Sequence, residues 1–312
     1  MIIRRTVVVA PPPPVERPRK PRPQGFRFEL VGSDGVLWNL SAGPVKLGTG
    51  VSGLVPADVE HYWSESPLMP GAVHRGYRPP AQMVRLPVRL RADGLALRDL
   101  DGELWRSLDP GGECVLRVTS PDAVTRTLPM RFVGVGDVEF NRDPIVMGQL
   151  DYTLTFTAPD PLWRGETETA TVTPPDAGGF PTAFAHRGGV INLVTGLSSG
   201  SSVIRNNGDA PSWPVYAVSG PVDAFKVGVG DSTLNYGAVE EGATVWVDTH
   251  PLRQTIGFAR DANDEGAWSQ VTRRAFDAVP AGVEVPVTLE MTFPGPGASA
   301  TVEVTPRSRR PW

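Results

Sequence analysis

Proline and glycine interrupt this sequence at short intervals along most of its length. Its 312 residues include 33 prolines and 34 glycines. Proline breaks the interior of a helix, because it lacks an amide hydrogen and its ring clashes with the preceding turn. The proline share is about twice the ~5% of an average protein. The composition therefore argues against long helices and favours many short strands joined by turns.

The length of the chain favours two compact units, since one domain usually holds ~100–200 residues. Residues 158–165, APDPLWRG, interrupt a strand pattern with two prolines, and the composition then shifts towards threonine, glycine and valine. We place the domain boundary there, and we expect Trp163 to act as a wedge between the domains. The resulting division is a proline-rich basic arm (1–24), a first domain (25–164), a second domain (165–305) and a C-terminal tail (306–312).

The first domain begins with a predicted hairpin. Apolar and polar residues alternate over 26–30 and again over 36–40, around the turn sequence GSDG, as they do in half-buried strands. The clearest strand is 84–91, VRLPVRLR, in which aliphatic residues occupy every second position. One face of this strand should pack and the other should meet solvent, and Pro87 indicates an edge strand or a bulge.

One helix is predicted, over about 97–108. It carries leucines on a single face and is ended by the sequence DPGG at 109–112, and it should lie on the sheet through that face. The leucines are Leu97, Leu100, Leu104 and Leu108. Further strands are predicted over 114–119, 124–133 and 150–156, where the first domain closes.

The second domain is predicted to be a β-sandwich, because short strand patterns and turn signals alternate along it. The chain as a whole is therefore expected to be mainly β. The predicted strands of the second domain cover 190–194, 202–205, 214–219, 225–229, 244–248, 254–258, 283–293 and 298–305.

The arm allows two interpretations. Residues 11–24, PPPPVERPRKPRPQ, form an extended polyproline-II-like spacer whose positive charges repel one another. It is either a solvated tail or a support that carries a short strand onto a neighbouring subunit; the strand residues would be Thr6, Val7, Val8 and Val9. The apolar run at the start is shorter than the ~7–15 residues of a signal peptide, and no run approaches the ~18 residues of a membrane span. Neither export nor a membrane span is predicted.

Charge and cysteine content narrow the range of partners. The formal net charge is −4, so no broad basic field favours nucleic acid, and a protein partner is expected instead. The single cysteine, Cys114, lies in the alternating sequence CVLRV and is interpreted as a small buried apolar residue. No intramolecular disulfide can form, which fits assembly in a reducing cytoplasm.

Motifs that would indicate catalysis or metal binding are incomplete. The sequence GLSSG at 196–200 matches a nucleophile elbow but is followed by a strand pattern instead of a helix. The sequence DANDEG at 261–266 imitates the start of a calcium loop, but Thr272 occupies the twelfth position, where glutamate is needed. The histidines are dispersed and predict no zinc site; they are His61, His74, His186 and His250. No catalytic residue, metal site or cofactor is expected.

The order of these elements carries a resemblance to a known family. Residues 78–90, the helix, the hairpin up to Phe132 and the sequence LDYTLTFTAPDPLW at 150–163 resemble the N-terminal split-barrel domain of phage distal tail proteins, which are called minor tail proteins in actinobacterial phages. In the second domain, NNGDAPSWPV at 206–215 and VWVDT at 245–249 resemble the galectin-like sandwich of that family. The match covers roughly residues 25–305 and leaves out the arm, which is no feature of the family.

The resemblance implies a structural, non-enzymatic protein of a siphovirus-like virion, located at the tail tip and assembled in the host cytoplasm. The first domain would form a ring, usually a hexamer, that joins the tail tube protein to the tape-measure and tip or baseplate hub proteins. The sandwich would project outward. A closed ring also protects exposed strand edges, which are a liability in a monomer.

Carbohydrate binding by the second domain is the alternative hypothesis. Trp213, Trp246 and Trp268 would stack on a host surface glycan if they shared a solvent-exposed face. Trp246 alternates with Val245 and Val247, however, and a buried core position is the expectation for it.

Overall fold

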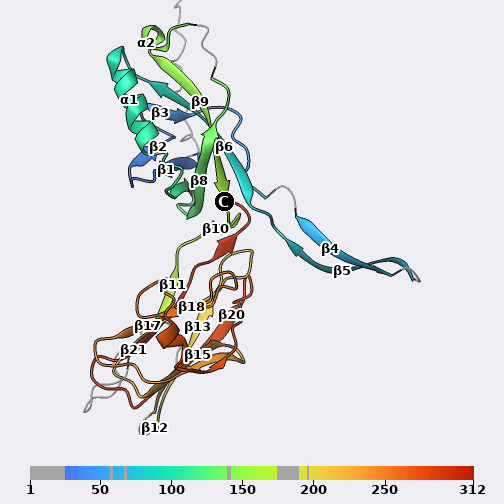
Figure 1. The fold of residues 1–312 in the computed structure, drawn as a ribbon, viewed down its shortest axis with the longest axis vertical. Coiled ribbons are helices and arrows are strands. Elements are labelled where there is room, and N and C mark those ends of the chain that lie inside the picture. Colours follow the sequence, from blue (N-terminus) through green and yellow to red (C-terminus); the bar gives the residue numbers. More distant parts are fainter. Residues whose placement is uncertain (1–24, 57–58, 67–68, 139–141, 174–189, 195–196) are drawn as a thin grey trace, which may run out of the picture.

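The computed structural model describes residues 25–56, 59–66, 69–138, 142–173, 190–194 and 197–312. Strands dominate this part of the chain, as the proline and glycine content predicts. Figure 1 shows a barrel-like first domain with a helix along one side, a sandwich below it, and a long hairpin that projects away from both. None of the helices in the described ranges has the length and apolar character needed to cross a membrane.

The first domain is built on one strongly curved antiparallel sheet. Its main path has the order β2-β1-β7-β8-β9-β6-β3, and the two edge strands β2 and β3 approach each other, so the sheet is nearly closed. The strands are β1 (Arg27–Val31), β2 (Leu37–Asn39), β3 (Val45–Leu47), β6 (Gln82–Arg91), β7 (Cys114–Thr119), β8 (Thr125–Val135) and β9 (Gln149–Ala158). The predicted hairpin is confirmed as β1 and β2, which pair Leu30 with Trp38.

Strand β6 confirms the predicted alternation but is not an edge strand. Its aliphatic residues are buried and its arginines are exposed, while β9 and β3 flank it on either side. The carbonyl of Pro87 accepts a hydrogen bond from the Gly48 amide at 2.7 Å, so the proline nitrogen faces the end of β3 as well. The ladder with β9 is therefore intact, because the missing amide hydrogen would not have pointed towards β9. On the other side the pairing with β3 already stops at Val88.

The predicted helix exists, shifted towards the N-terminus by two residues. Helix α1 (Leu95–Arg106) follows Gly94, whose φ of 53° favours glycine, and ends at Ser107. Leu97 and Leu104 are buried in the core as expected, and Leu108 is buried beyond the helix end. A second, very short helix, α2 (Pro144–Met147), begins at Asp143, whose side chain accepts a hydrogen bond from the Ile145 amide.

The second domain is the predicted sandwich. One sheet has the order β11-β21-β14-β17-β18 and the other β12-β13-β20-β15-β16-β19. The first comprises β11 (Glu168–Val172), β14 (Val215–Ser219), β17 (Thr244–Asp248), β18 (Thr255–Gly257) and β21 (Ser299–Val304). The second comprises β12 (Val190–Val194), β13 (Leu197–Arg205), β15 (Ala224–Val229), β16 (Ser232–Tyr236), β19 (Val271–Arg274) and β20 (Glu284–Thr292). The short helix α3 (Glu265–Trp268) precedes β19.

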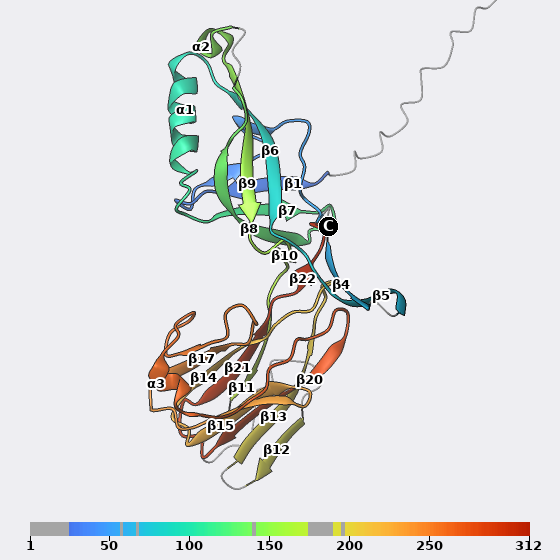
Figure 2. The same cartoon turned by 45° about the vertical axis from the view of Figure 1, so that its right-hand side comes forward.

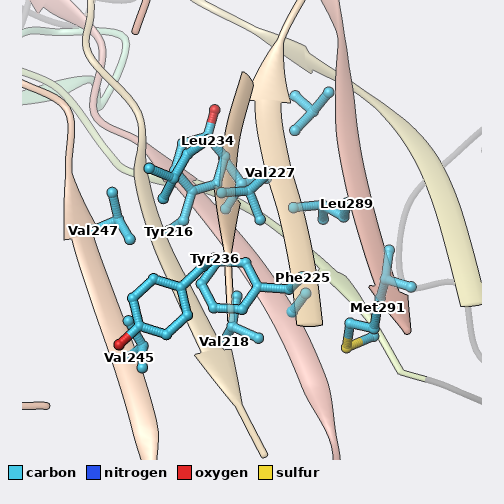
Figure 3. Close-up of a cluster of buried hydrophobic side chains, with 14 of the residues drawn as sticks. Tyr216, Val218, Phe225, Val227, Leu234, Tyr236, Val245, Val247, Leu289 and Met291 are labelled. Carbon is cyan, nitrogen blue, oxygen red and sulfur yellow. The ribbon is translucent and has the colours of Figure 1, made fainter. Parts of the chain in front are cut away.

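Side chains from both sheets meet in the core of the sandwich. Figure 3 shows Tyr216, Val245 and Val247 from one sheet facing residues of the other, and all three are buried. The rings of Phe225 and Tyr236 stack with centroids 4.8 Å apart. This buried apolar area is the main source of stability for such a sandwich.

The chain returns to the first domain at its C-terminal end. Strand β22 (Arg307–Ser308), within the segment expected to be a tail, pairs with β10 (Trp163–Arg164), and β10 also pairs with β8. The Arg126 guanidinium donates hydrogen bonds to the carbonyl oxygens of Arg310 and Trp312 at 2.8 and 2.6 Å. The segment therefore bonds to both domains, because the Arg307 carbonyl also accepts hydrogen bonds from the Asp209 and Ala210 amides of the sandwich.

Several strands that the sequence did not predict are present, including β3, β11, β16, β19 and one long pair. Strands β4 (Glu60–Ser66) and β5 (Met69–Arg78) form a long antiparallel hairpin that pairs with no other described strand. We call it the projecting hairpin. Figures 1 and 2 show it leaving the first domain near the junction with the sandwich.

Candidate functional site

The projecting hairpin is exposed along its whole described length. Every residue of β4 is exposed, and so are nearly all residues of β5 whose burial is known. A two-stranded hairpin with no further strand or helix to cover it is marginally stable in water. A surface of this kind indicates an interaction with another molecule.

Aromatic side chains gather on one face of the projecting hairpin. His61 is paired with Tyr77 and Trp63 with His74 across the two strands, so the four side chains share a face. The ring centroids of Trp63 and His74 lie 4.9 Å apart in an edge-on arrangement. Trp63 and Tyr77 are 58% and 52% exposed, which is unusual for side chains of this size and typical of protein interfaces.

A salt bridge lies at the base of the hairpin. The Arg78 guanidinium is 3.0 Å from the Glu60 carboxylate, where the two strands begin their pairing. Both side chains are largely exposed, so the pair fixes the register of the strands more than it stabilises the fold.

A cavity of about 230 Å³ lies between the first domain and the sandwich. Trp213 and Trp246 both line it, together with charged residues from the two domains. The expectation that Trp246 is a core residue is wrong: Val245 and Val247 are fully buried, whereas Trp246 is only partly buried and faces the cavity. The Arg260 guanidinium lies 4.9 Å from the centre of its ring.

The charges around this cavity are largely paired. The Arg307 guanidinium contacts both carboxylate oxygens of Asp160 at 2.6 Å, which ties the second domain to the first. On the sandwich side, Arg253 is 3.0 Å from Asp248. A cavity with paired charges and aromatic walls suits a neutral polar ligand better than an anion.

His250 also lines the cavity, and its environment opposes protonation. Burial lowers the pKa of His250 below the usual 6.5, and the positive charges of Arg307 and Arg253 lower it further. The Leu252 amide donates a hydrogen bond to its Nδ1 at 3.3 Å, which requires that nitrogen to be unprotonated.

We expect the stability of the protein to fall in mild acid through His250. As the pH drops below 6.5, the unfolded chain binds a proton on this side chain before the folded chain does, so the free energy of unfolding decreases. Above pH 6.5 neutral His250 makes its full contribution to the free energy of unfolding. Urea denaturation at pH 7.5 and 5.5 should show a smaller difference in His250→Asn, which keeps an acceptor for the Leu252 amide, than in the unmodified protein. Equal differences in both proteins would contradict the assignment.

The other tryptophans singled out in the sequence lie elsewhere. Trp268 is at the end of α3, where its indole nitrogen donates to Asn263 at 2.6 Å and Arg274 lies over its ring. It lies outside the cavity, so the three tryptophans do not share a face. Trp163 is fully buried in the core of the first domain, and its indole nitrogen donates to the Leu54 carbonyl at 2.9 Å. Its role as a wedge between domains stays a prediction.

The remaining sequence candidates lie in a strand, in a turn or outside the described residues. Thr6, Val7, Val8 and Val9 lie outside the described part of the chain. Residues 197–200 of the elbow-like motif belong to β13, which pairs with β20. The side-chain oxygens of Asn263 and Asp264 accept hydrogen bonds from Trp268 and Phe258, so they serve the turn.

Two of the dispersed histidines are brought together. His61 Nδ1 and His74 Nε2 lie 3.1 Å apart on the projecting hairpin. The sequence patterns did not predict this pair, because no strands were expected over 60–78. The signal that would have revealed it is the concentration of aromatic residues in the sequences HYW and AVHRGY, which favours strands.

Comparisons with known proteins agree with this architecture. No protein-family model and no curated protein matches the chain. Among solved structures, it is similar to SPP1 Dit (gp 19.1), described as a paradigm of the hub adsorption apparatus in phages that infect Gram-positive bacteria. The TM-score is 0.58 and the identity 16%, covering 91% of this chain and 99% of that one.

Two structures of the phage P2 baseplate in its activated conformation also match. The form with calcium has a TM-score of 0.53 and 11% identity, covering 92% of this chain and 100% of the other. The form with strontium has a TM-score of 0.51 and 11% identity, covering 90% and 98%. The chain therefore has the mainly β fold of phage distal tail and baseplate hub proteins, as the resemblance in its sequence implied.

Proposed function

We propose that this protein is a structural, non-enzymatic component of a phage tail tip. In this proposal its copies form a closed ring, a hexamer by the resemblance, that joins the tail tube and tape-measure proteins to the tip or baseplate proteins. The likeness to SPP1 Dit supports the proposal because it extends over 91% of this chain and so includes both domains. The protein would act in the virion after assembly in the host cytoplasm.

The exposure of the projecting hairpin is the observation that best supports the proposed ring. It extends beyond the body of its own subunit (Figure 1), and Trp63 and Tyr77 remain exposed on it. In a ring, the neighbouring copy lies on that side and covers these aromatic side chains, which removes apolar area from water. The same contact repeated around an axis leaves no hairpin exposed.

Light scattering on the purified protein over a concentration series tests the ring. We expect a discrete species whose mass is a whole multiple of 33.5 kDa and does not grow further with concentration, because a closed ring has no free interface. A monomer at every concentration, with and without the tail tube protein, would contradict the proposal.

Carbohydrate binding is a second candidate function. It is favoured by the placement of Trp213 and Trp246 in one cavity beside paired Arg253 and Asp248, since sugars stack on indole rings and bond to paired charged groups. We propose that the ligand is a neutral glycan of the host surface.

A saccharide titration followed by tryptophan fluorescence tests the second candidate. The fluorescence should respond in the unmodified protein and in Trp268→Ala, whose altered side chain lies outside the cavity, but not in Trp213→Ala. A response that survives Trp213→Ala, or no response to any neutral host glycan, rules out this cavity as the glycan site.

A further inference from the structure

Two imidazoles face each other on the projecting hairpin. His61 Nδ1 and His74 Nε2 are 3.1 Å apart, and the ring centroids are 5.2 Å apart. Both side chains are exposed. They come from neighbouring strands whose pairing places them on the same face, so the cross-strand register holds them together.

The spacing of the two nitrogens suits a shared metal ion. Imidazole nitrogens bind zinc at ~2.0–2.1 Å, and two such bonds to nitrogens 3.1 Å apart subtend an angle of about 95–102°. This angle lies between the ~90° of square-planar and the ~109° of tetrahedral coordination. The two nitrogens share a hydrogen bond in this structure, and a metal ion would replace that bond once the rings rotate so that both lone pairs face it.

We propose that His61 and His74 bind one divalent transition-metal ion of the Zn²⁺, Ni²⁺ and Cu²⁺ class on the exposed face of the projecting hairpin. Neutral imidazole is a preferred ligand of these ions. In the described part of the chain, no cluster of three or more metal-binding side chains is found. In this proposal water molecules fill the remaining coordination positions.

The surroundings of the pair leave it open to an ion. The nearby carboxylate of Glu60 is engaged by Arg78 and by the Tyr62 hydroxyl, so it does not compete for the imidazoles. Trp63 flanks His74 at a centroid distance of 4.9 Å. That contact places a fluorescent reporter beside the site. Because the neighbouring copy would cover this face in the proposed ring, the metal site belongs to the subunit whose hairpin is free of that contact.

Calorimetric titration of the full, untagged chain with Zn²⁺ at pH 7.5 tests the proposal. We expect one ion per chain, and at least a tenfold loss of affinity in His61→Ala and in His74→Ala, because each variant removes one of two ligands. His250→Ala is the matched control and should bind like the unmodified protein. Cu²⁺ should bind more tightly than Zn²⁺ or Ni²⁺.

A second readout separates binding at this site from binding elsewhere. Ni²⁺ should quench part of the tryptophan fluorescence in the unmodified protein, and Trp63→Phe should lose that change while still binding the ion. Zinc binding that is absent, or that survives either His61→Ala or His74→Ala unchanged, overturns the proposal. Light scattering on the same samples reports assembly separately, so failure of the metal site and failure of the ring are distinguished.

Discussion

A chain in which a short Gly-Ser linker replaces residues 60–78 should be a folded monomer that no longer assembles. The strands of the projecting hairpin pair with each other and with no other described strand, so their removal takes little from the core of either domain. Glu60 and Arg78 are paired partners, which places their Cα atoms within ~5.5 Å, and a short linker can close the gap. Light scattering would show the loss of the ring.

Thermal denaturation provides the control for this deletion. The melting temperature of the monomer should change little, because the deleted side chains are exposed. A milder variant, Trp63→Ala with Tyr77→Ala, should also weaken assembly, because it removes the two most exposed aromatic side chains of the projecting hairpin. A deletion that still forms the full ring would show that another surface holds the copies together.

Trp163→Ala should destabilise the first domain by about 3–5 kcal/mol, the usual cost of truncating a buried aromatic residue to alanine. The side chain is fully buried, and its removal also takes away the hydrogen bond to the Leu54 carbonyl. Urea denaturation followed by circular dichroism measures the loss. This is a large share of the ~5–15 kcal/mol that stabilises a typical domain.

Trp63→Ala is the matched control, since it makes the same substitution at a tryptophan that is 58% exposed. Its free energy of unfolding should change by less than about 0.5 kcal/mol. The two substitutions are therefore expected to separate stability from assembly: Trp163→Ala destabilises the first domain, and Trp63→Ala weakens the ring. A loss below about 1 kcal/mol in Trp163→Ala would mean that the core refills the space left by the indole.

The parts of the fold that the sequence predicted are those in which one face is buried and the other is wet. Strand β6 alternates aliphatic residues with arginines, so its pattern identifies both the strand and its inner face. The helix was predicted from its leucines, but its ends were not: Gly94, whose φ is 53°, precedes the first turn, and Ser107 caps the last. The spacing of hydrophobic residues carries no information on the residue at which a helix begins or ends.

The projecting hairpin could not be predicted in this way, because neither of its faces packs on its own subunit. No alternation of burial marks β4, and register shifts beside Trp63 and Ser66 interrupt the period of two further. The same limit applies to the paired histidines, whose closeness depends on that register. A strand that is exposed on both faces lacks the alternating pattern that packing on a core imposes.

Trp246 illustrates a different limit. The sequence VWV places tryptophan and valine on opposite faces of β17 but does not say which face is the core. The tryptophan is larger and was expected inside, yet Val245 and Val247 fill the sandwich. The opposing sheet already contributes large rings from Phe225 and Tyr236, so the smaller side chains complete the packing.

The return of the chain to the first domain has a mechanical consequence. Strands β10 and β22 lie in the two connections that lead into and out of the sandwich, and their pairing joins these connections. The salt bridge between Asp160 and Arg307 reinforces this junction. Phe26 and Trp312 lie on the first domain with ring centroids 5.6 Å apart. Tension applied between these two residues would therefore reach the β10–β22 pairing before it reached the interior of the sandwich.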